Sequence, residues 1–266
     1  MNMIGRYGTQ TDICRCGRFR SCKYLNAIIC QFALISLSRL AVIFGELLLQ
    51  RHKHAYSAVF HHPSEDSISG ALRSFKYSHH LRDWCVTVLT PEVDAFEIVD
   101  PALEAQIPAS VRVIRTRFLN TKRHLAWRGV YPSLLALPDR WIGWLPWAVA
   151  AGKRLIETDP VDLIYSTSPH ATAHLIAMRL AKASGQPWVA DFRDPWFEET
   201  PEPGDSSGPL FHRLNRWLEA RAVACSSQVV ASTTHLCDLM RTRYPQHADK
   251  IGAILNGYDE ADFAAL

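Results

Sequence analysis

Residues Asp162–Trp196, DLIYSTSPHATAHLIAMRLAKASGQPWVADFRDPW, decide the fold. A short apolar run at Leu163–Ser166 predicts a buried strand, and Ala171–Ser184 predicts a helix that a following Gly and Pro end. A second apolar run at Trp188–Phe192 predicts the next strand. A strand, a helix and a strand in this order indicate two parallel strands joined by a helical crossover.

The same alternation continues on both sides of this stretch. We therefore predict an α/β fold, a Rossmann-like parallel sheet with helices on both faces. The segment 198–209, EETPEPGDSSGP, is expected to be a surface loop. The other expected strands are 55–60, 85–89, 111–116, 228–231 and 251–255, and the other expected helices are 69–81, 141–157, 210–224 and 234–244.

The front of the chain differs in composition, so we predict an N-terminal extension at 1–53 and a domain at 54–266. The first 54 residues hold eight Lys/Arg against two Asp/Glu, whereas the remainder holds 21 against 24. The apolar stretch 27–49 is expected to be a helix, long enough for a membrane span of about 20 residues. Arg39 and Glu46 oppose insertion. A membrane anchor, a helix packed on the domain or lying at an interface, and a poorly ordered extension all stay open.

Charge and cysteine usage exclude some classes of partner. The net charge of +3 is too small to indicate nucleic acid. Seven cysteines without regular spacing argue against a disulfide framework and indicate a reducing compartment. No metal site is expected, because Cys14, Cys16 and Cys22 lack a second pair, and His170 and His174 lack an intervening Glu.

The residues after each strand matter most, since ligands of open α/β sheets bind beyond the carboxyl ends of the strands. The strand at 163–166 leads into Ser166-Thr167-Ser168-Pro169-His170. Ser168 suits the N-cap of the following helix and Pro169 its first position. Capping alone would explain them, whereas a functional interpretation adds hydroxyls and free N–H groups that face the crevice.

The strand at 188–192 ends in charges. Asp191, Arg193 and Asp194 are followed by Trp196 and Glu198. Charges at the end of a buried strand are costly unless they are paired or face a polar cleft. An internal Asp191–Arg193 pair would satisfy this condition. We favour a cluster that hydrogen-bonds sugar hydroxyls or steadies a phosphate.

Two further segments are candidates. A loop after the strand at 55–60 ends in Ser69-Gly70, where a Gly lets backbone N–H groups approach an anion, although a plain turn capped by Ser69 is the alternative. Trp141, Trp144 and Trp147 suit a membrane interface, a sugar-stacking surface or the core.

Together these segments resemble the N-terminal domain of family 4 glycosyltransferases, especially bacterial members that build cell-surface polysaccharide. The resemblance covers about residues 55–266. Its most specific parts are the STSP and DFRDPW turns, followed by the closing NGYDEADF. It is carried, in order, by HHPSEDSISGALRSFKYSHHL, WCVTVLT, VRVIRTR, DRWIGWLPWAVAAGKRL, DLIYSTSPHATAHLIAMRLAKASGQPWVADFRDPW, RWLEARAVACSSQVVAST and KIGAILNGYDEADF.

The resemblance implies a GT-B fold, in which this half receives the acceptor and a second half holds the nucleotide-sugar. It implies sugar transfer with retention, a nucleotide-sugar as co-substrate, no cofactor, and a sugar or lipid-linked acceptor. The location would be the cytoplasm, with the inner face of the cytoplasmic membrane as an open alternative. The implied residues are Asp194 and Asp191 for catalysis, Ser166, Thr167, Ser168, His170, Arg193, Trp196 and Glu198 for the acceptor, Ser69 and Gly70 near the donor diphosphate, and Asn256 and Gly257 in the linker to the donor domain.

No donor domain with a paired-glutamate motif is recognised in the sequence, so we expect this chain to be inactive or very weak alone. The alternative is a catalytically inactive truncated remnant or a membrane-associated binding module with the same fold. A dinucleotide-binding oxidoreductase is disfavoured, because no G-x-G-x-x-G follows a clear strand.

Overall fold

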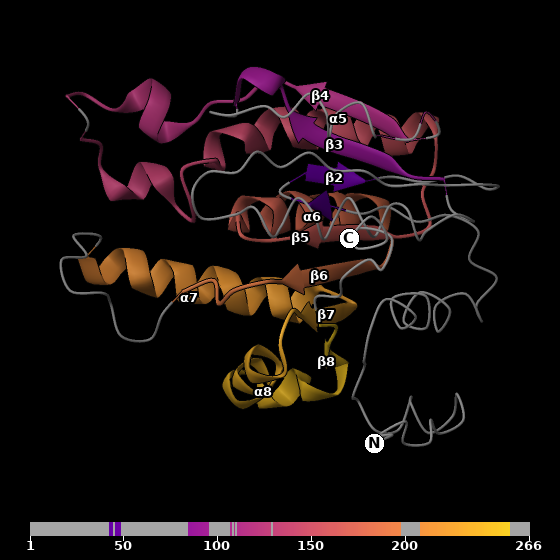
Figure 1. Ribbon diagram of the computed structural model, residues 1–266, viewed down its shortest axis with the longest axis vertical. Coiled ribbons are helices and arrows are strands. Elements are labelled where there is room, and N and C mark those ends of the chain that lie inside the picture. The colour runs from indigo at the N-terminus through magenta and orange to yellow at the C-terminus, as the bar shows by residue number, and fades with distance from the viewer. Residues whose placement is uncertain are drawn as a thin grey trace, which may run out of the picture.

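The computed structural model describes residues 85–95, 107, 109, 111–128, 130–197 and 208–255, and two short strands at 43–44 and 46–48. In this part of the chain, eight strands form one sheet in the order β4-β3-β2-β1-β5-β6-β7-β8 (Figure 1). The strands are β1 Ile43–Phe44, β2 Glu46–Leu48, β3 Thr87–Pro91, β4 Arg112–Thr116, β5 Ile164–Thr167, β6 Trp188–Phe192, β7 Gln228–Ala231 and β8 Ile251–Ala253.

The sheet is parallel except at β2. β3 pairs with β4, and β5, β6, β7 and β8 pair in succession, all in parallel. β2 runs antiparallel to β1, β3 and β5. The predicted Rossmann-like parallel sheet is therefore confirmed, with one short reversed strand inside it.

Four helices follow the strands in alternation, at α5 Leu145–Thr158, α6 Ala171–Ser184, α7 Gly208–Cys225 and α8 Thr234–Arg243. Each connects a strand to one further along the sheet in the same direction. Right-handed crossovers in one direction place their helices on one face of the sheet. Contacts of α6 with both α5 and α7 agree with this arrangement. α6 ends where Gly185 adopts a φ of 73°, a left-handed conformation that glycine reaches without steric cost.

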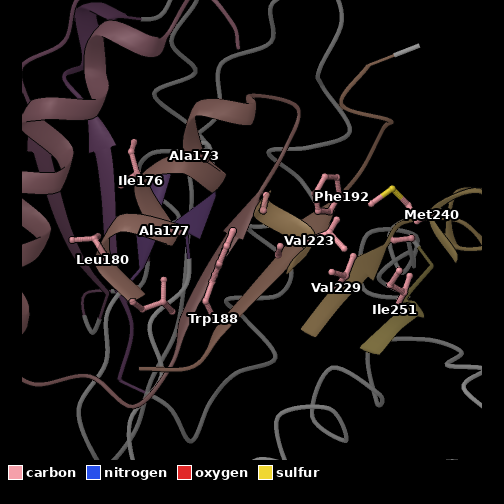
Figure 2. Close-up of a cluster of buried hydrophobic side chains, with 14 of the residues drawn as sticks. Ala173, Ile176, Ala177, Leu180, Trp188, Phe192, Val223, Val229, Met240 and Ile251 are labelled. Carbon is pink, nitrogen blue, oxygen red and sulfur yellow. The ribbon is translucent and has the colours of Figure 1, made fainter. Parts of the chain in front are cut away.

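The core lies between β5–β8 and these helices. Trp188 and Phe192 of β6 are fully buried in one apolar cluster that also contains Ile176 and Leu180 of α6 (Figure 2). The two aromatic residues lie on one face of β6, since side chains alternate along a strand. Met240 of α8 extends the same core toward β7 and β8.

The front of the chain corrects one expectation. Ile43–Phe44 and Glu46–Leu48 are strands within the sheet, so the helix expected across 27–49 is wrong at these positions. An apolar run without polar periodicity fits a buried strand as well as a helix, and here it fills the sheet between β3 and β5. These two strands belong to the sheet although they precede residue 54, where the domain was expected to begin. Residues 53 and 54, the expected boundary, lie outside the described residues. The strand expected at 55–60 and the helix expected at 69–81 also lie outside them.

Among the residues that the structure describes, none of the helices has both the length and the apolar character needed to cross a membrane.

Candidate functional site

The turns after β5, β6 and β7 are hydrogen-bonded to one another along the carboxyl edge of the sheet. The backbone N–H of Arg193 donates to the Ser168 hydroxyl at 2.8 Å, and the Arg193 guanidinium donates to the Ser168 carbonyl at 3.2 Å. On the other side, the Ser232 hydroxyl donates to the Arg193 carbonyl at 2.7 Å. The STSP and DFRDPW turns therefore meet at one edge, as expected from the parallel order of the strands.

The side chains at the end of β5 divide between the two faces of the sheet. Ser166 lies under α6, where its hydroxyl contacts His174 Nδ1 and accepts from Trp188 Nε1, each at 2.7 Å. The Thr167 hydroxyl lies on the opposite face and donates to Asp191 Oδ2 at 2.7 Å. Thr167 and Asp191 are register partners in β5 and β6, which places their side chains next to each other.

The two carboxylates predicted for catalysis have different environments. Asp191 is fully buried, and its carboxylate accepts the Thr167 hydrogen bond inside the protein. Asp194 is exposed beyond the end of β6. Of the two, only Asp194 presents a carboxylate at the surface of the rim, and the catalytic roles stay predictions.

A positively charged corner lies beside the Ser168 turn. His170 is half-buried and its ring packs against Trp141, with ring centroids 5.5 Å apart. Burial and the positive charges of Arg140 and Arg193 lower the pKa of His170 to about 3, so the imidazole is neutral at physiological pH. Two guanidinium groups beside a neutral imidazole form a corner suited to an anionic or hydroxyl-rich ligand.

The first turn of α6 is capped from a distance, which corrects the expected local cap. α6 begins at Ala171 with His170 at the N-cap, and the Ser168 hydroxyl accepts from Arg193 instead of capping the helix. Asp139 supplies the cap. Its carboxylate accepts from the Thr172 N–H at 2.7 Å and from the Thr172 hydroxyl at 2.8 Å, and burial raises its pKa. This N–H of α6 is therefore already occupied by a protein carboxylate.

His174 lies one turn further along α6 and is fully buried. Its ring stacks on Phe192, with centroids 4.6 Å apart, and Trp196 lies 5.8 Å away. The Ser166 hydroxyl accepts from the Trp188 indole and also contacts His174 Nδ1, so it ties the His174 ring to the end of β5. Burial lowers the pKa of His174 to about 3, which keeps the ring neutral.

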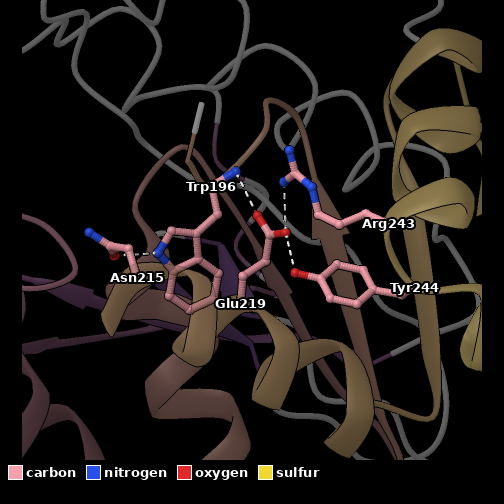
Figure 3. A network of polar contacts seen from close by, with 5 residues as sticks. All are labelled: Trp196, Asn215, Glu219, Arg243 and Tyr244. Carbon is pink, nitrogen blue, oxygen red and sulfur yellow. Dashed lines mark hydrogen bonds and ion pairs between the residues drawn. The ribbon is translucent and has the colours of Figure 1, made fainter. Parts of the chain in front are cut away.

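A buried carboxylate that sequence reasoning missed holds the DFRDPW turn in place. Glu219 of α7 accepts from the Trp196 backbone N–H at 3.1 Å and from the Tyr244 hydroxyl at 2.6 Å (Figure 3). Arg243 forms an ion pair with it at 2.9 Å. Asn215 accepts from Trp196 Nε1 at 3.0 Å. The signal in the sequence was two polar residues four apart, on the helical stripe that also carries buried Ala222 and Val223.

The tryptophan-rich segment before α5 is mostly core. Trp141 and Trp144 are buried, and Trp144 Nε1 donates to the Thr116 hydroxyl at 2.7 Å, while Trp147 is partly exposed. Of the alternatives for this segment, core packing therefore accounts for two of the three indoles.

Several predicted residues fall outside the part of the chain that the structure describes, so their roles stay predictions. They are Glu198, Ser69, Gly70, Asn256 and Gly257. Within the described ranges, no three His, Cys, Asp or Glu side chains converge as metal ligands.

A parallel α/β sheet with a polar, hydrogen-bonded rim at its carboxyl edge is a Rossmann-like arrangement, and ligands of such sheets bind beyond the carboxyl ends of the strands. The family model described as Glycosyltransferase Family 4 matches residues 82–262, and the chain belongs to that family. Family membership makes this a glycosyltransferase domain, and its fold is consistent with one half of a GT-B enzyme. No match is found among curated proteins.

Proposed function

We propose that this chain forms the acceptor-side half of a retaining glycosyltransferase that moves a sugar from a nucleotide-sugar to a cell-surface polysaccharide or glycoconjugate precursor. The observation that carries the proposal is the bonded rim of Ser168, Arg193 and Ser232 at the carboxyl edge of the sheet. Family membership supplies the reaction class.

The rim offers the types of group that a sugar acceptor needs. Arg193 and Arg140 supply positive charge beside His170, and Trp196 in the turn after β6 is a half-buried aromatic residue. Sugars and phosphates are held by such combinations of charged hydrogen-bond donors and aromatic faces. Asp194 is the exposed carboxylate that would orient an acceptor hydroxyl, and catalysis would depend on this positioning.

The buried residues would act indirectly. Thr167 with Asp191 joins the ends of β5 and β6, and Ser166 with His174 joins the end of β5 to α6. We propose that these pairs and the buried Ser168 fix the rim while Arg193 and Asp194 face the acceptor. A second Rossmann-like half would bring the nucleotide-sugar, with no further cofactor, in the cytoplasm or at the inner face of its membrane.

The test combines the chain with the donor half of a family 4 glycosyltransferase, both as separate polypeptides and as a fusion. Labelled nucleotide-sugars are supplied together with lipid-linked and free sugar acceptors, with and without EDTA. We expect transfer only when both halves are present, in amounts that EDTA does not change.

Asp194→Asn is the diagnostic variant, and Asp238→Asn, at an exposed position on α8, is its matched control. Loss of a positioning carboxylate is expected to lower transfer by about tenfold or more, whereas the control stays at the parent rate. The proposal is wrong if both halves fold and no nucleotide-sugar supports transfer. Equal rates for the two variants would remove Asp194 from the site.

A further inference from the structure

The segment between β4 and α5 exposes an unusual amount of apolar surface. We call residues 117–138, RFLNTKRHLAWRGVYPSLLALP, the basic-apolar segment. Trp127 is 80% exposed and Val130 is 74% exposed. Leu125, Leu134 and Leu135 are about half exposed. Large side chains of this kind gathered in one segment mark an interaction surface rather than ordinary surface scatter.

The tip of the segment holds its apolar side chains in a fixed arrangement. Trp127 and Val130 form a β-bridge, with N–H to carbonyl bonds of 2.8 and 3.0 Å in the two directions. Residues directly opposite in such a bridge point to the same side. Arg128 turns the chain between them with a φ of 52°. The indole and the isopropyl group are therefore presented together.

The base of the segment is tied to the domain. Thr121 is fully buried, and its hydroxyl donates to the Leu135 carbonyl at 2.8 Å. Its backbone N–H donates to the Arg140 carbonyl at 2.8 Å. The two arms of the segment are thus joined below the exposed tip. A ligand bound at the tip would therefore hold the whole domain in place.

The charge of the segment is uniformly positive. Arg117, Lys122, Arg123 and Arg128 are all exposed, and the 22 residues contain no Asp or Glu. The remainder of the chain beyond residue 54 is acidic on balance, so this charge is local.

We propose that the basic-apolar segment docks the protein on an anionic lipid bilayer, with Trp127 and Val130 in the headgroup region and Arg117, Lys122 and Arg128 on lipid phosphates. Tryptophan with Lys and Arg is the combination enriched at membrane interfaces. The absence of Asp and Glu from the segment favours an anionic bilayer over a protein partner, because clusters of Lys and Arg are attracted to the negative surface potential of such a bilayer. Here cations are interleaved with the apolar side chains along the segment.

The segment leaves β4 at its carboxyl end, the edge that also carries the Ser168 and Arg193 turns (Figure 1). Docking would therefore hold the rim close to the bilayer, where a lipid-linked acceptor would be presented. This last consequence rests on the proposed function, whereas the docking itself does not.

The test measures sedimentation of the full chain with vesicles of phosphatidylcholine, with and without phosphatidylglycerol. We expect binding that needs the anionic lipid and weakens as salt is raised, because surface potentials are screened. Trp127→Ala should weaken binding roughly tenfold through lost apolar burial. Replacing Lys122 and Arg128 together by Gln should weaken it about fivefold for each charge removed.

Matched controls separate this surface from others on the chain. Trp217→Ala removes an exposed indole on α7, and Lys153→Gln with Arg154→Gln removes two exposed cations on α5. Both should bind vesicles like the parent. The proposal is overturned if the parent does not bind anionic vesicles, or if the controls weaken binding as much as the segment variants. It is also overturned if Trp127→Ala changes only self-association in analytical ultracentrifugation.

Discussion

The backbone N–H of Arg193 donates to the hydroxyl of Ser168 at 2.8 Å, and this bond joins the turn after β5 to the turn after β6. Ser168 also accepts the Arg193 guanidinium on its carbonyl, and its own N–H donates to the Asp191 carbonyl at 3.0 Å. One serine therefore fixes both the backbone and the side chain of the neighbouring arginine.

Replacing Ser168 by Ala should loosen the rim. The Arg193 N–H loses its acceptor in a mostly buried place, so the free energy of unfolding should fall by about 1–2 kcal/mol. Urea denaturation measures this loss. Thr242→Ala, at an exposed hydroxyl on α8, should change stability by less than about 0.5 kcal/mol and serves as the control. A loss at Ser168 no larger than at Thr242 would contradict the role of this bond.

Glu219→Gln should be strongly destabilising although it keeps the side-chain shape. Arg243 would lose the counter-charge of a fully buried carboxylate, and breaking a buried pair from one side costs about 3–5 kcal/mol. Because Glu219 also holds the Trp196 backbone, the near-UV circular dichroism of the folded protein should change. Glu157→Gln, at an exposed position on α5, provides the comparison and should leave both stability and spectrum unaltered.

Acid should destabilise the protein through His174. Burial lowers the pKa of His174 from 6.5 to about 3. Between these two pH values the imidazole is protonated in the unfolded chain and neutral in the folded protein. The stabilisation is complete above pH 6.5 and is lost as the pH falls toward 3. This group contributes a slope of about 1.4 kcal/mol per pH unit.

The measurement compares denaturation of the parent and His174→Asn from pH 7 to about pH 5. Asparagine does not titrate, so its stability should depend less steeply on pH over this range. Parallel curves for the two proteins would show that His174 does not cause the acid dependence.

Gly143→Ala should be poorly tolerated. An added Cβ would lie 2.5 Å from the Leu119 carbonyl oxygen and 2.8 Å from the Leu119 Cβ, so the backbone would have to move. Overpacking of this kind costs about 1–3 kcal/mol, which thermal unfolding should detect. Lys153→Ala, at an exposed position on α5, is the control. Gly152→Ala is unsuitable as a control because Gly152 is buried within α5. If Gly143→Ala and Lys153→Ala had the same melting temperature, Leu119 would be able to move aside without a measurable cost in stability.

Local pattern predicted much of the fold because periodicity and turn residues are properties of neighbouring positions. The bounds of α6, β6 and β7 match those expected, and β3 lies two residues later than expected. The strands at 43–48 were missed because an apolar run does not itself distinguish a buried strand from a helix. Only its place between distant strands decides that it is extended.

The candidate site was predictable in outline and not in detail. The meeting of the STSP and DFRDPW turns follows from parallel strand order, which local sequence can indicate. The contacts of Asp139 with Thr172, and of Glu219 with Trp196, join residues far apart in the chain. Nothing near Asp139 or Glu219 indicates such a partner. Alternation could have separated Ser166 from Thr167, because adjacent residues of a strand face opposite sides.

The order of β5, β6, β7 and β8 in the sheet repeats their order along the chain. Each of the strands β6, β7 and β8 therefore pairs with the strand that precedes it in the chain, and one α-helix lies between the two. This portion can assemble stepwise as the polypeptide leaves the ribosome, with short loops to close and few rival pairings. The other edge of β5 pairs with β1, which is synthesised much earlier. The edge of β1 that pairs with β5 therefore has no partner strand until β5 has been synthesised.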